Sequence, residues 1–323
     1  MMEGSYTKIN YGLRPSKAVE RKMLCEAFRK LYVFGKLELY RYIGFGSTYF
    51  SDFILFHKAL GIKNMLSIEK DIENRKRFEF NLPYKCINIE FGESVKILPR
   101  LNWDIRTILW LDYDHKLNSD ALADIKYFCT KAVAGSILVV TVNAEPKKLN
   151  GEYPQKKLVE QRYNELQELV GKEKIPYGTS GKNLSGWGLA KVSANIVKNE
   201  ILETLNERNG GREPGSKIVY EQLFNFNYAD GAKMVTTGGL FYDEGQANFV
   251  AQSGIKNHDF ITDSDDPYKI EVPNLTYKEI RFIDTHLPTD TIESIASPSI
   301  PKDDLQKYFK IYRYFPTFVE TEI

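Results

Sequence analysis

The chain has 323 residues, of which 42% are hydrophobic and 27% charged, a composition that supports a buried core and excludes wholesale disorder. Its 44 basic and 43 acidic residues leave a net charge of +1, which excludes a strong overall attraction to nucleic acid or anionic membranes. The three cysteines match no zinc or disulfide spacing, the polar start has no signal-peptide pattern, and no apolar run approaches the roughly 20 residues of a membrane span. We therefore expect a cytoplasmic protein with no membrane partner.

The N-terminal region, residues 1–38, is expected to be an arm followed by one helix. Ser16 is placed to cap a helix over Lys17–Val33, with apolar residues on one side and basic residues on the other. The basic side has two interpretations, which are a solvated helix face, the more common case, or a clamp for an anionic substrate. The cationic cluster on that side consists of Arg14, Lys17 and Arg21.

The next region, residues 39–147, alternates short apolar strands with helical segments. This rhythm predicts a doubly wound, mostly parallel Rossmann-like α/β sheet with helices on both faces. Ligands of such sheets bind outside the carboxyl ends of the strands. The predicted strands are Arg41–Phe45, Met65–Glu69, Cys86–Ile89, Thr107–Leu111 and Ile137–Val142, and the predicted helices are Tyr49–Leu60, Asp71–Phe80, Ser94–Leu98 and Ser119–Lys131.

The remainder of the chain predicts a helical insert over 148–217, a hairpin over 218–245 and a C-terminal extension over 246–323. The hairpin follows from two strand-like runs joined by Asp230-Gly231, because this dipeptide between apolar runs favours a tight turn. The other predicted elements are helices over Gln155–Val170, Leu189–Leu205, Tyr277–His286 and Lys302–Tyr314 and strands over Ile218–Tyr228 and Ala232–Tyr242.

Polar groups follow the ends of the predicted parallel strands. The first strand runs into Gly44-Phe45-Gly46, the second ends at Glu69, the third precedes Glu93-Ser94, and the fourth ends at Asp112. With the late hairpin, this order resembles the class I S-adenosylmethionine-dependent methyltransferase fold over about 39–143 and 218–242. The resemblance implies that S-adenosylmethionine is the cofactor.

The same resemblance implies a role for each of these groups. Glycines at this turn let the backbone approach the methionine part of the cofactor, where a side chain would clash. Glu69 takes the place of the acid that accepts hydrogen bonds from the ribose hydroxyls, Glu93 and Ser94 fall where adenine is contacted, and Asp112 lies beside the transferred methyl group. The cofactor-binding residues implied are Tyr42, Gly44, Gly46, Ser47, Glu69, Glu93, Ser94 and Asp112.

Two positions depart from the family pattern. Tyr42 stands where an acid usually precedes the first glycine, and Thr48 replaces a third glycine. A nicotinamide cofactor fits less well, because Gly-x-Gly-x-x-Gly would need a glycine at Tyr49. The departures favour, as an alternative, a non-catalytic module that binds a nucleotide or a protein partner.

The segment Leu111-Asp112-Tyr113-Asp114-His115 resembles the Asp-x-Asp-His segment of small-molecule O-methyltransferases. Metal-dependent members hold magnesium with an acid here and an Asp-Asn pair after the fifth strand. The corresponding pair is Val142-Asn143, which lacks one carboxylate, so no metal is expected. An oxygen nucleophile needs a base, and an amine needs only a polar acceptor. The predicted catalytic residues are Asp112, Asp114 and His115.

The sequence therefore predicts O- or N-methylation of a polar small or medium substrate. Methylation of RNA or DNA is the alternative, because the basic side of the first helix and the many Tyr and Phe residues suit nucleic-acid binding. An aromatic segment over 312–318 either docks on the domain or joins two copies in a homo-oligomer. The predicted substrate-binding residues are Arg14, Lys17, Arg21 and Asn143.

Overall fold

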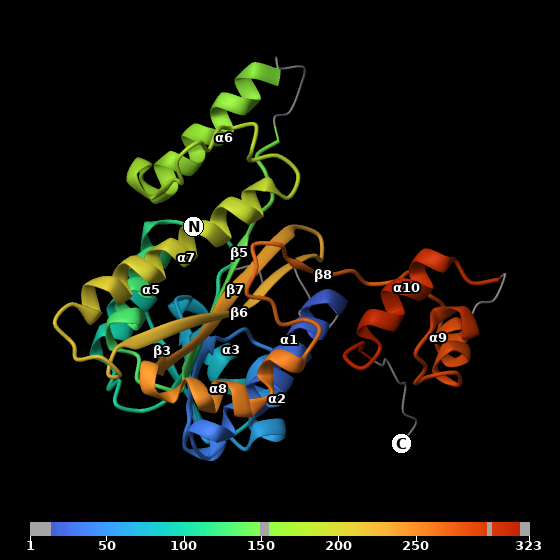
Figure 1. Cartoon of the computed structure of the whole chain (residues 1–323), viewed down its shortest axis with the longest axis horizontal. Helices are drawn as coiled ribbons and strands as arrows, with labels where there is room; N and C mark the ends of the chain where they lie inside the picture. The colour runs from blue at the N-terminus through green and yellow to red at the C-terminus, as the bar shows by residue number, and fades with distance from the viewer. Residues whose placement is uncertain (1–13, 149–154, 296–298, 317–323) are drawn as a thin grey trace.

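A computed structural model describes residues 14–148, 155–295 and 299–316, and its centre is an eight-stranded sheet (Figure 1). The apolar runs predicted from the sequence form its parallel part, and the Asp230-Gly231 turn joins its longest two strands. The strands are β1 (Arg41–Phe45), β2 (Asn64–Glu69), β3 (Ile87–Phe91), β4 (Thr107–Asp112), β5 (Ser136–Asn143), β6 (Ile218–Ala229), β7 (Lys233–Asp243) and β8 (Tyr268–Ile270).

The strand order is β3-β2-β1-β4-β5-β7-β6-β8. Strands β1 to β5 are mutually parallel, and β7 inserts antiparallel between β5 and β6. The predicted Rossmann-like sheet with a late antiparallel hairpin is confirmed. From β1 the chain adds β2 and β3 on one side of the sheet and then returns to add β4 and β5 on the other side. The neighbours β1 and β4 therefore form the topological switch point, at which doubly wound sheets bind ligands.

Helices cover both faces of this sheet (Figure 1). Those over 119–131 and 155–170 have the predicted bounds, whereas the predicted helix over 71–80 splits into a 3-10 turn and a shorter α-helix. The helices are α1 (Pro15–Arg29), α2 (Ser51–Leu60), α3 (Arg75–Phe80), α4 (Ser94–Ile97), α5 (Ser119–Lys131), α6 (Gln155–Val170), α7 (Gly188–Asn209), α8 (Ala247–Ser253), α9 (Tyr277–Asp284) and α10 (Lys302–Ile311).

Two large apolar cores lie on opposite faces of the sheet. One core packs α1, α2, α3 and α8 against the sheet, and the other packs α4, α5 and α7. In the first core Phe28, Phe53 and Phe56 are fully buried, and Phe28 meets Phe56 edge-on with ring centroids 5.3 Å apart. Helix α1 is therefore an integral layer of the fold and lies beside α2 and the β6–β7 hairpin.

The start of α1 corrects one prediction. The first helical residue is Pro15, and the Ser16 side chain makes no capping bond. The carboxylate of Asp230, in the β6–β7 turn, instead accepts the backbone N–H groups of Ser16 at 3.2 Å and of Lys17 at 2.9 Å. The predicted Ser16 cap is wrong because a long-range carboxylate satisfies these free N–H groups. The helical path also continues past Arg29 as a 3-10 helix, Lys30–Phe34, and stops at Gly35.

The C-terminal helices α9 and α10 have a small core of their own (Figure 1). The hydroxyl of Tyr308 donates to Asp284 at 2.8 Å and ties the two helices together. Within the aromatic segment, Tyr314 and Phe315 pack half-buried against the first core, so its described part docks on the domain. Thr317 and Phe318 lie outside the described residues. In the described part of the chain no helix has the length and apolar character that a membrane span requires.

Candidate functional site

The predicted acids leave the same edge of the sheet. Glu69 ends β2 and Asp112 ends β4, on either side of β1. Both follow residues whose side chains enter the first core, Met65 before Glu69 and Trp110 before Asp112. Because side chains alternate along a strand, the two carboxylates face the same side of the sheet. The structure thus brings Glu69 and Asp112 to the same edge and the same face of the sheet, beside the switch point.

Burial changes the acidity of Glu69. One carboxylate oxygen accepts the backbone N–H of Asp71 at 3.1 Å. Burial, together with the negative charges of Asp71 and Asp114, raises the pKa of Glu69 to about 7, against the lowering effect of the backbone N–H groups of Asp71 and Lys70. A carboxyl group at this strand end therefore changes its charge near neutral pH, which is a common property of functional sites.

The turn after β1 is closed by contacts within the chain. A Cβ atom at Gly46 would clash with the Ser67 hydroxyl and lie 3.1 Å from the Phe50 ring, and one at Gly44 would clash with the Tyr42 hydroxyl. Phe50 adopts a left-handed conformation, φ 46°, just before α2, which is a strained backbone for a bulky residue. The buried Ser67 hydroxyl has no hydrogen-bond partner among the described residues. The turn thus has glycines where a side chain would clash, a strained residue just after it and an unsatisfied hydroxyl packed behind it.

Replacement of Gly46 by alanine should lower the free energy of unfolding by about 1–3 kcal/mol, because the new methyl group overpacks the contact with Ser67. Chemical denaturation measures this change. Ser67→Ala alone should be nearly neutral, since its hydroxyl is unpartnered, and Ser67→Ala in the Gly46→Ala background should recover part of the loss. Equal stabilities of the Gly46→Ala variant and the wild type would refute this packing.

Tyr42, which stands where the family pattern has an acid, is paired with Asp52. Tyr42 is fully buried, and its hydroxyl donates to the carboxylate of Asp52 on α2. Burial raises the pKa of both groups, while the positive charge of Arg21 opposes the shift of Asp52. An acid of α2 is therefore hydrogen-bonded to the side chain at position 42. Sequence reasoning missed Asp52, and its only signal was an acid in the first turn of the helix after the glycines.

Lys17 is the partner of Asp112. Its side chain is 1% exposed, and its ammonium lies 2.7 Å from Asp112 Oδ1 and 2.7 Å from Glu20 Oε2. The ammonium also donates to the Tyr228 hydroxyl at 3.1 Å and sits 4.4 Å from the Trp110 ring centroid. A buried cation between two carboxylates orients Asp112 from a helix outside the parallel sheet.

The polar network continues from Glu20 across the sheet. The hydroxyl of Thr236 donates to Glu20, a second hydrogen bond of 2.7 Å joins Thr236 to Thr141, and the indole N–H of Trp110 donates to Thr141 at 3.0 Å. Burial raises the pKa of Glu20, and the nearby Lys17 charge lowers it. These contacts hold the Lys17 environment rigid, because nearly every polar group in it has a partner.

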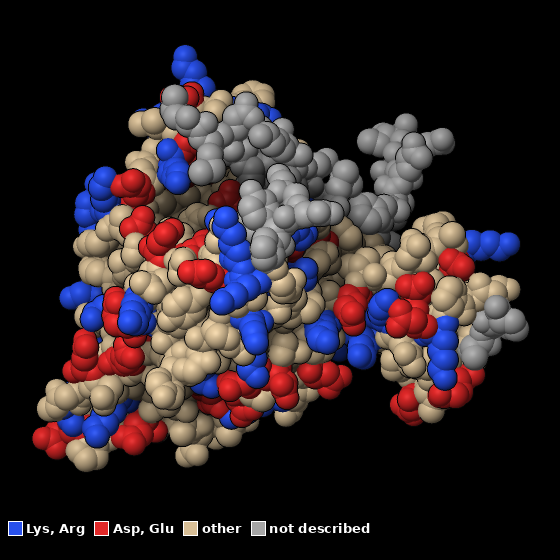
Figure 2. Space-filling view, turned by 90° about the horizontal axis from the view of Figure 1, so that it is seen from above, with Lys and Arg blue, Asp and Glu red and all other residues tan. Residues whose placement is uncertain are grey.

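The predicted cationic side of the first helix faces carboxylates. Lys17 contacts Asp112, Arg21 is 9% exposed and lies near Asp52, and Arg14 Nε is 3.8 Å from Asp230. A solvated face is therefore wrong for Lys17 and Arg21, because both residues are buried. Figure 2 shows Lys and Arg intermingled with Asp and Glu on the coloured part of the face in view, without one continuous basic surface there.

The residues after β3 have partners within the chain. Ser94 donates to the carboxylate of Asp124 on α5, which also accepts from the Tyr113 hydroxyl at 2.7 Å. Burial raises the pKa of Asp124 to about 6. Glu93 is exposed and pairs with Lys96. The structure thus uses Ser94 to tie α4 to α5, and contacts of Glu93 and Ser94 with adenine stay predictions.

His115 is positioned by backbone groups. Its Nδ1 lies 2.8 Å from the carbonyl oxygen of Lys116, and its own carbonyl accepts the N–H of Asn143, the last residue of β5, at 3.0 Å. A carbonyl only accepts, so Nδ1 carries the hydrogen and Nε2 carries the lone pair of the neutral ring. Nε2 has no hydrogen-bond partner in the described part of the chain. Asp114 is exposed, and the Asn143 side chain accepts from the Glu145 N–H at 2.8 Å.

Ser47 caps its own turn by accepting the Tyr49 N–H at 3.2 Å. Across the residues that the structure describes, no group of three or more His, Cys, Asp or Glu side chains is arranged to hold a metal ion. The expectation of a metal-free site stays a prediction.

Comparison with known proteins gives one match over nearly the whole chain. The model of the family described as "Putative O-methyltransferase" matches residues 9–323. No curated protein matches the sequence. Similar solved structures include cofactor-bound Rv0187 from MTB, with 12% identity, 69% of this chain and 87% of that chain covered and a TM-score of 0.36. CalS10, an amino pentose methyltransferase from Micromonospora echinaspora solved with bound SAM, has 11% identity, coverage of 47% and 62% and a TM-score of 0.34.

LepI, solved with SAH and a substrate analogue, has 8% identity, a TM-score of 0.33 and coverage of 62% of this chain. The chain spans 42% of the length of LepI. TM-scores of this size carry no conclusion about activity, so the family match is the finding from which function is argued.

Proposed function

The chain belongs to this O-methyltransferase family, and from that premise we propose that it transfers a methyl group from S-adenosylmethionine to an oxygen of a polar small or medium-sized acceptor. The observation that carries the proposal is the convergence of Glu69, Asp112 and the Gly44–Gly46 turn on one side of the switch point. That convergence is the arrangement which the sequence resemblance implies for an adenosyl sulfonium.

The residues at this edge fit such a cofactor. The turn carries no side chain at Gly44 and Gly46, where the Tyr42 and Ser67 hydroxyls pack closely, and the Ser67 hydroxyl still has a hydrogen bond to make. Glu69 would accept hydrogen bonds from the ribose hydroxyls, and Asp112 would lie beside the sulfonium. When bound, the cofactor supplies an electrophilic methyl group. Two carboxyl groups, Glu20 and Asp112, surround the single ammonium of Lys17, an excess of acidic groups that suits a cationic ligand.

The work of the chain itself is to position the acceptor and remove its proton. The Nε2 lone pair of His115 is the base that we assign, since the carbonyl of Lys116 fixes the ring tautomer. Asp112 is held by Lys17, and Asp114 is exposed, so neither is as well placed to take a proton. Asn143 is hydrogen-bonded to the backbone of His115 and lies beside it for contact with the acceptor.

Calorimetric titration with S-adenosylmethionine tests the cofactor assignment. Affinity should increase by up to about tenfold between about pH 6 and about pH 8, because Glu69, with a pKa of about 7, becomes ionised and then accepts hydrogen bonds from the ribose. Glu69→Gln should bind more weakly at the higher pH and lose this pH dependence. A wild-type chain that gives neither heat nor a thermal shift at millimolar ligand would sink the proposal.

A further inference from the structure

Arg21 is a buried cation whose hydrogen-bond donors are unused. Of the basic residues at the start of α1, Arg14 lies 3.8 Å from Asp230, and Lys17 is paired with two carboxylates. Arg21 is only 9% exposed, yet no hydrogen bond or ion pair joins its guanidinium to another residue that the structure describes. A guanidinium has five N–H donors and no acceptor. A buried one therefore needs an acceptor from a ligand or from water.

The guanidinium lies at the ligand-binding edge of the sheet. Arg21 follows Lys17 by four positions, so the two side chains leave the same face of α1. Long side chains in helices point back toward the N-terminus, which brings the guanidinium toward the level of Lys17 and Asp112. Burial raises the pKa of Asp52 and of Tyr228, and the positive charge of Arg21 lowers both. Arg21 therefore lies between α2 and β6, on the face of the sheet that carries the candidate site.

The charges around Arg21 decide which kind of anion it can hold. Three carboxyl groups, those of Glu20, Asp52 and Asp112, surround the two cations Lys17 and Arg21. A free anion that enters here meets an excess of acids, and like charges repel. A carboxylate that belongs to a ligand with positive groups does not meet this penalty. The amino acid end of S-adenosylmethionine is of this kind, because its carboxylate lies close to an ammonium and a sulfonium.

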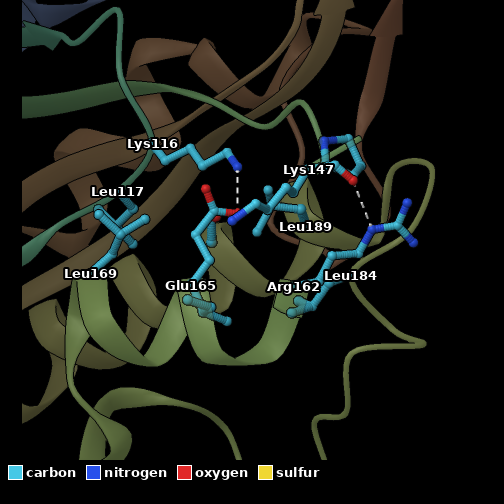
Figure 3. A pocket seen from close by; sticks show the side chains of 11 residues that line it. Lys116, Leu117, Lys147, Arg162, Glu165, Leu169, Leu184 and Leu189 are labelled. Carbon is cyan, nitrogen blue, oxygen red and sulfur yellow. Dashed lines mark hydrogen bonds and ion pairs between the residues drawn. The ribbon is translucent and has the colours of Figure 1, made fainter. Parts of the chain in front are cut away.

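A hollow under α6 lies on the opposite side of the sheet (Figure 3). Its free volume is about 10 Å³, room for about one water molecule, and leucines of the core opposite the candidate site line it. Lys116 in its wall is paired with Glu165 at 2.8 Å, and Arg162 donates through Nε to the Lys147 carbonyl at 3.2 Å. Neither the size nor the position of this hollow suits the amino acid end of the cofactor.

We propose that Arg21 binds the carboxylate in the methionine portion of S-adenosylmethionine, and that this contact makes the chain selective for a cofactor that retains its carboxylate. The guanidinium fork presents parallel N–H donors to the two oxygens of a carboxylate. The sequence resemblance assigns the methionine portion to the Gly44–Gly46 turn, and Asp52 lies in the first turn of the helix that follows it. The inference rests on the proposed function and names the residue that recognises one end of the cofactor.

Calorimetric titration of the full chain with S-adenosylmethionine and with decarboxylated S-adenosylmethionine tests this contact, because the two ligands differ only in the carboxylate. The wild type should bind S-adenosylmethionine roughly 10–100-fold more tightly, the range expected for hydrogen bonds between charged groups. Arg21→Met should bind S-adenosylmethionine more weakly and lose most of this preference. The same variant should bind the decarboxylated cofactor at least as tightly as the wild type does, because a positive charge beside a cationic ligand has been removed.

Arg21→Lys keeps the charge without the planar fork, so it should show an intermediate preference, and it decides the question where Arg21→Met does not fold. Arg29→Met is the matched control, because Arg29 belongs to the same helix, is 52% exposed and should leave both affinities unchanged.

Equal binding of the two cofactors by the wild type would overturn the role of Arg21 and leave the cofactor assignment standing. An equal loss of both affinities in either Arg21 variant would do the same, because a purely structural role predicts that result. A wild type that binds neither compound would reject methyl transfer and this contact together.

Discussion

Replacement of Lys17 by methionine should lower the free energy of unfolding by about 3–5 kcal/mol, the usual cost of removing one partner from a buried ion pair. Methionine retains the apolar contact with Trp110 but leaves Asp112 and Glu20 without their cation. Charges left unpaired in a buried site lose their solvation by water and receive nothing in return. The Lys17 and Glu20 side chains are 1% and 0% exposed, whereas that of Asp112 is 27% exposed, so water screens only the Asp112 part of the effect.

Urea denaturation of the wild type and of Lys17→Met measures this loss. Lys126→Met, which removes an ion pair of the same kind from the surface, should change stability by less than about 0.5 kcal/mol. The double variant Lys17→Met/Glu20→Gln should regain part of the stability, because one of the two stranded carboxylates becomes neutral. If Lys17→Met were as stable as Lys126→Met, Lys17 would not be holding two ionised carboxylates.

The second large effect is on catalysis. Replacement of His115 by glutamine should reduce kcat by about 10²–10⁴-fold, the range that a positioned general base contributes. Binding of S-adenosylmethionine should stay within about twofold of the wild type, because we assign His115 to the acceptor and not to the cofactor. The hydrogen bond to the Lys116 carbonyl fixes the ring so that Nε2 faces away from it, and glutamine has no comparable basic atom.

Formation of S-adenosylhomocysteine with a panel of polar hydroxylated small molecules measures this rate. Asp114→Asn is the matched control, since Asp114 precedes His115 and is exposed, and its activity should stay within about threefold of the wild type. Loss of activity in Asp114→Asn with normal activity in His115→Gln would move the base to Asp114. Absence of product from the wild type with every acceptor in the panel, despite cofactor binding, would favour a non-catalytic binding module.

Elements with a clear local pattern could be predicted, and two short elements without one, α8 and β8, were not. Gln155–Val170 was predictable to the residue because its apolar positions repeat with helical spacing over 16 residues. Helix α8 and strand β8 have seven and three residues, too few to show a period, and neither was predicted. Strand β8 exists because the edge of β6 offers it a partner at Phe226–Tyr228, a property of the assembled sheet.

Part of the candidate site was also predictable from sequence. Glu69 and Asp112 were identifiable because acids that end apolar strands collect at one edge of a parallel sheet. Their partners were not. Tyr42 and Asp52 are ten positions apart, but their contact depends on how α2 packs over β1. Lys17 lies on the basic side of the first helix, which in most helices is exposed to solvent. Its burial depends on where α1 packs in the fold.

By itself, then, the sequence determined the order of strands and helices, the tight β6–β7 turn and the acids at the strand ends, because each depends on residues close together in the chain. Only the tertiary structure decided that Lys17 is buried against Asp112, 95 positions away. It also decided that Asp230, in the hairpin 213 positions after Lys17, accepts the free N–H groups at the start of α1. The physical reason is that a charge is buried when a partner of opposite sign compensates it, and the partner's position is set by the packing of whole layers.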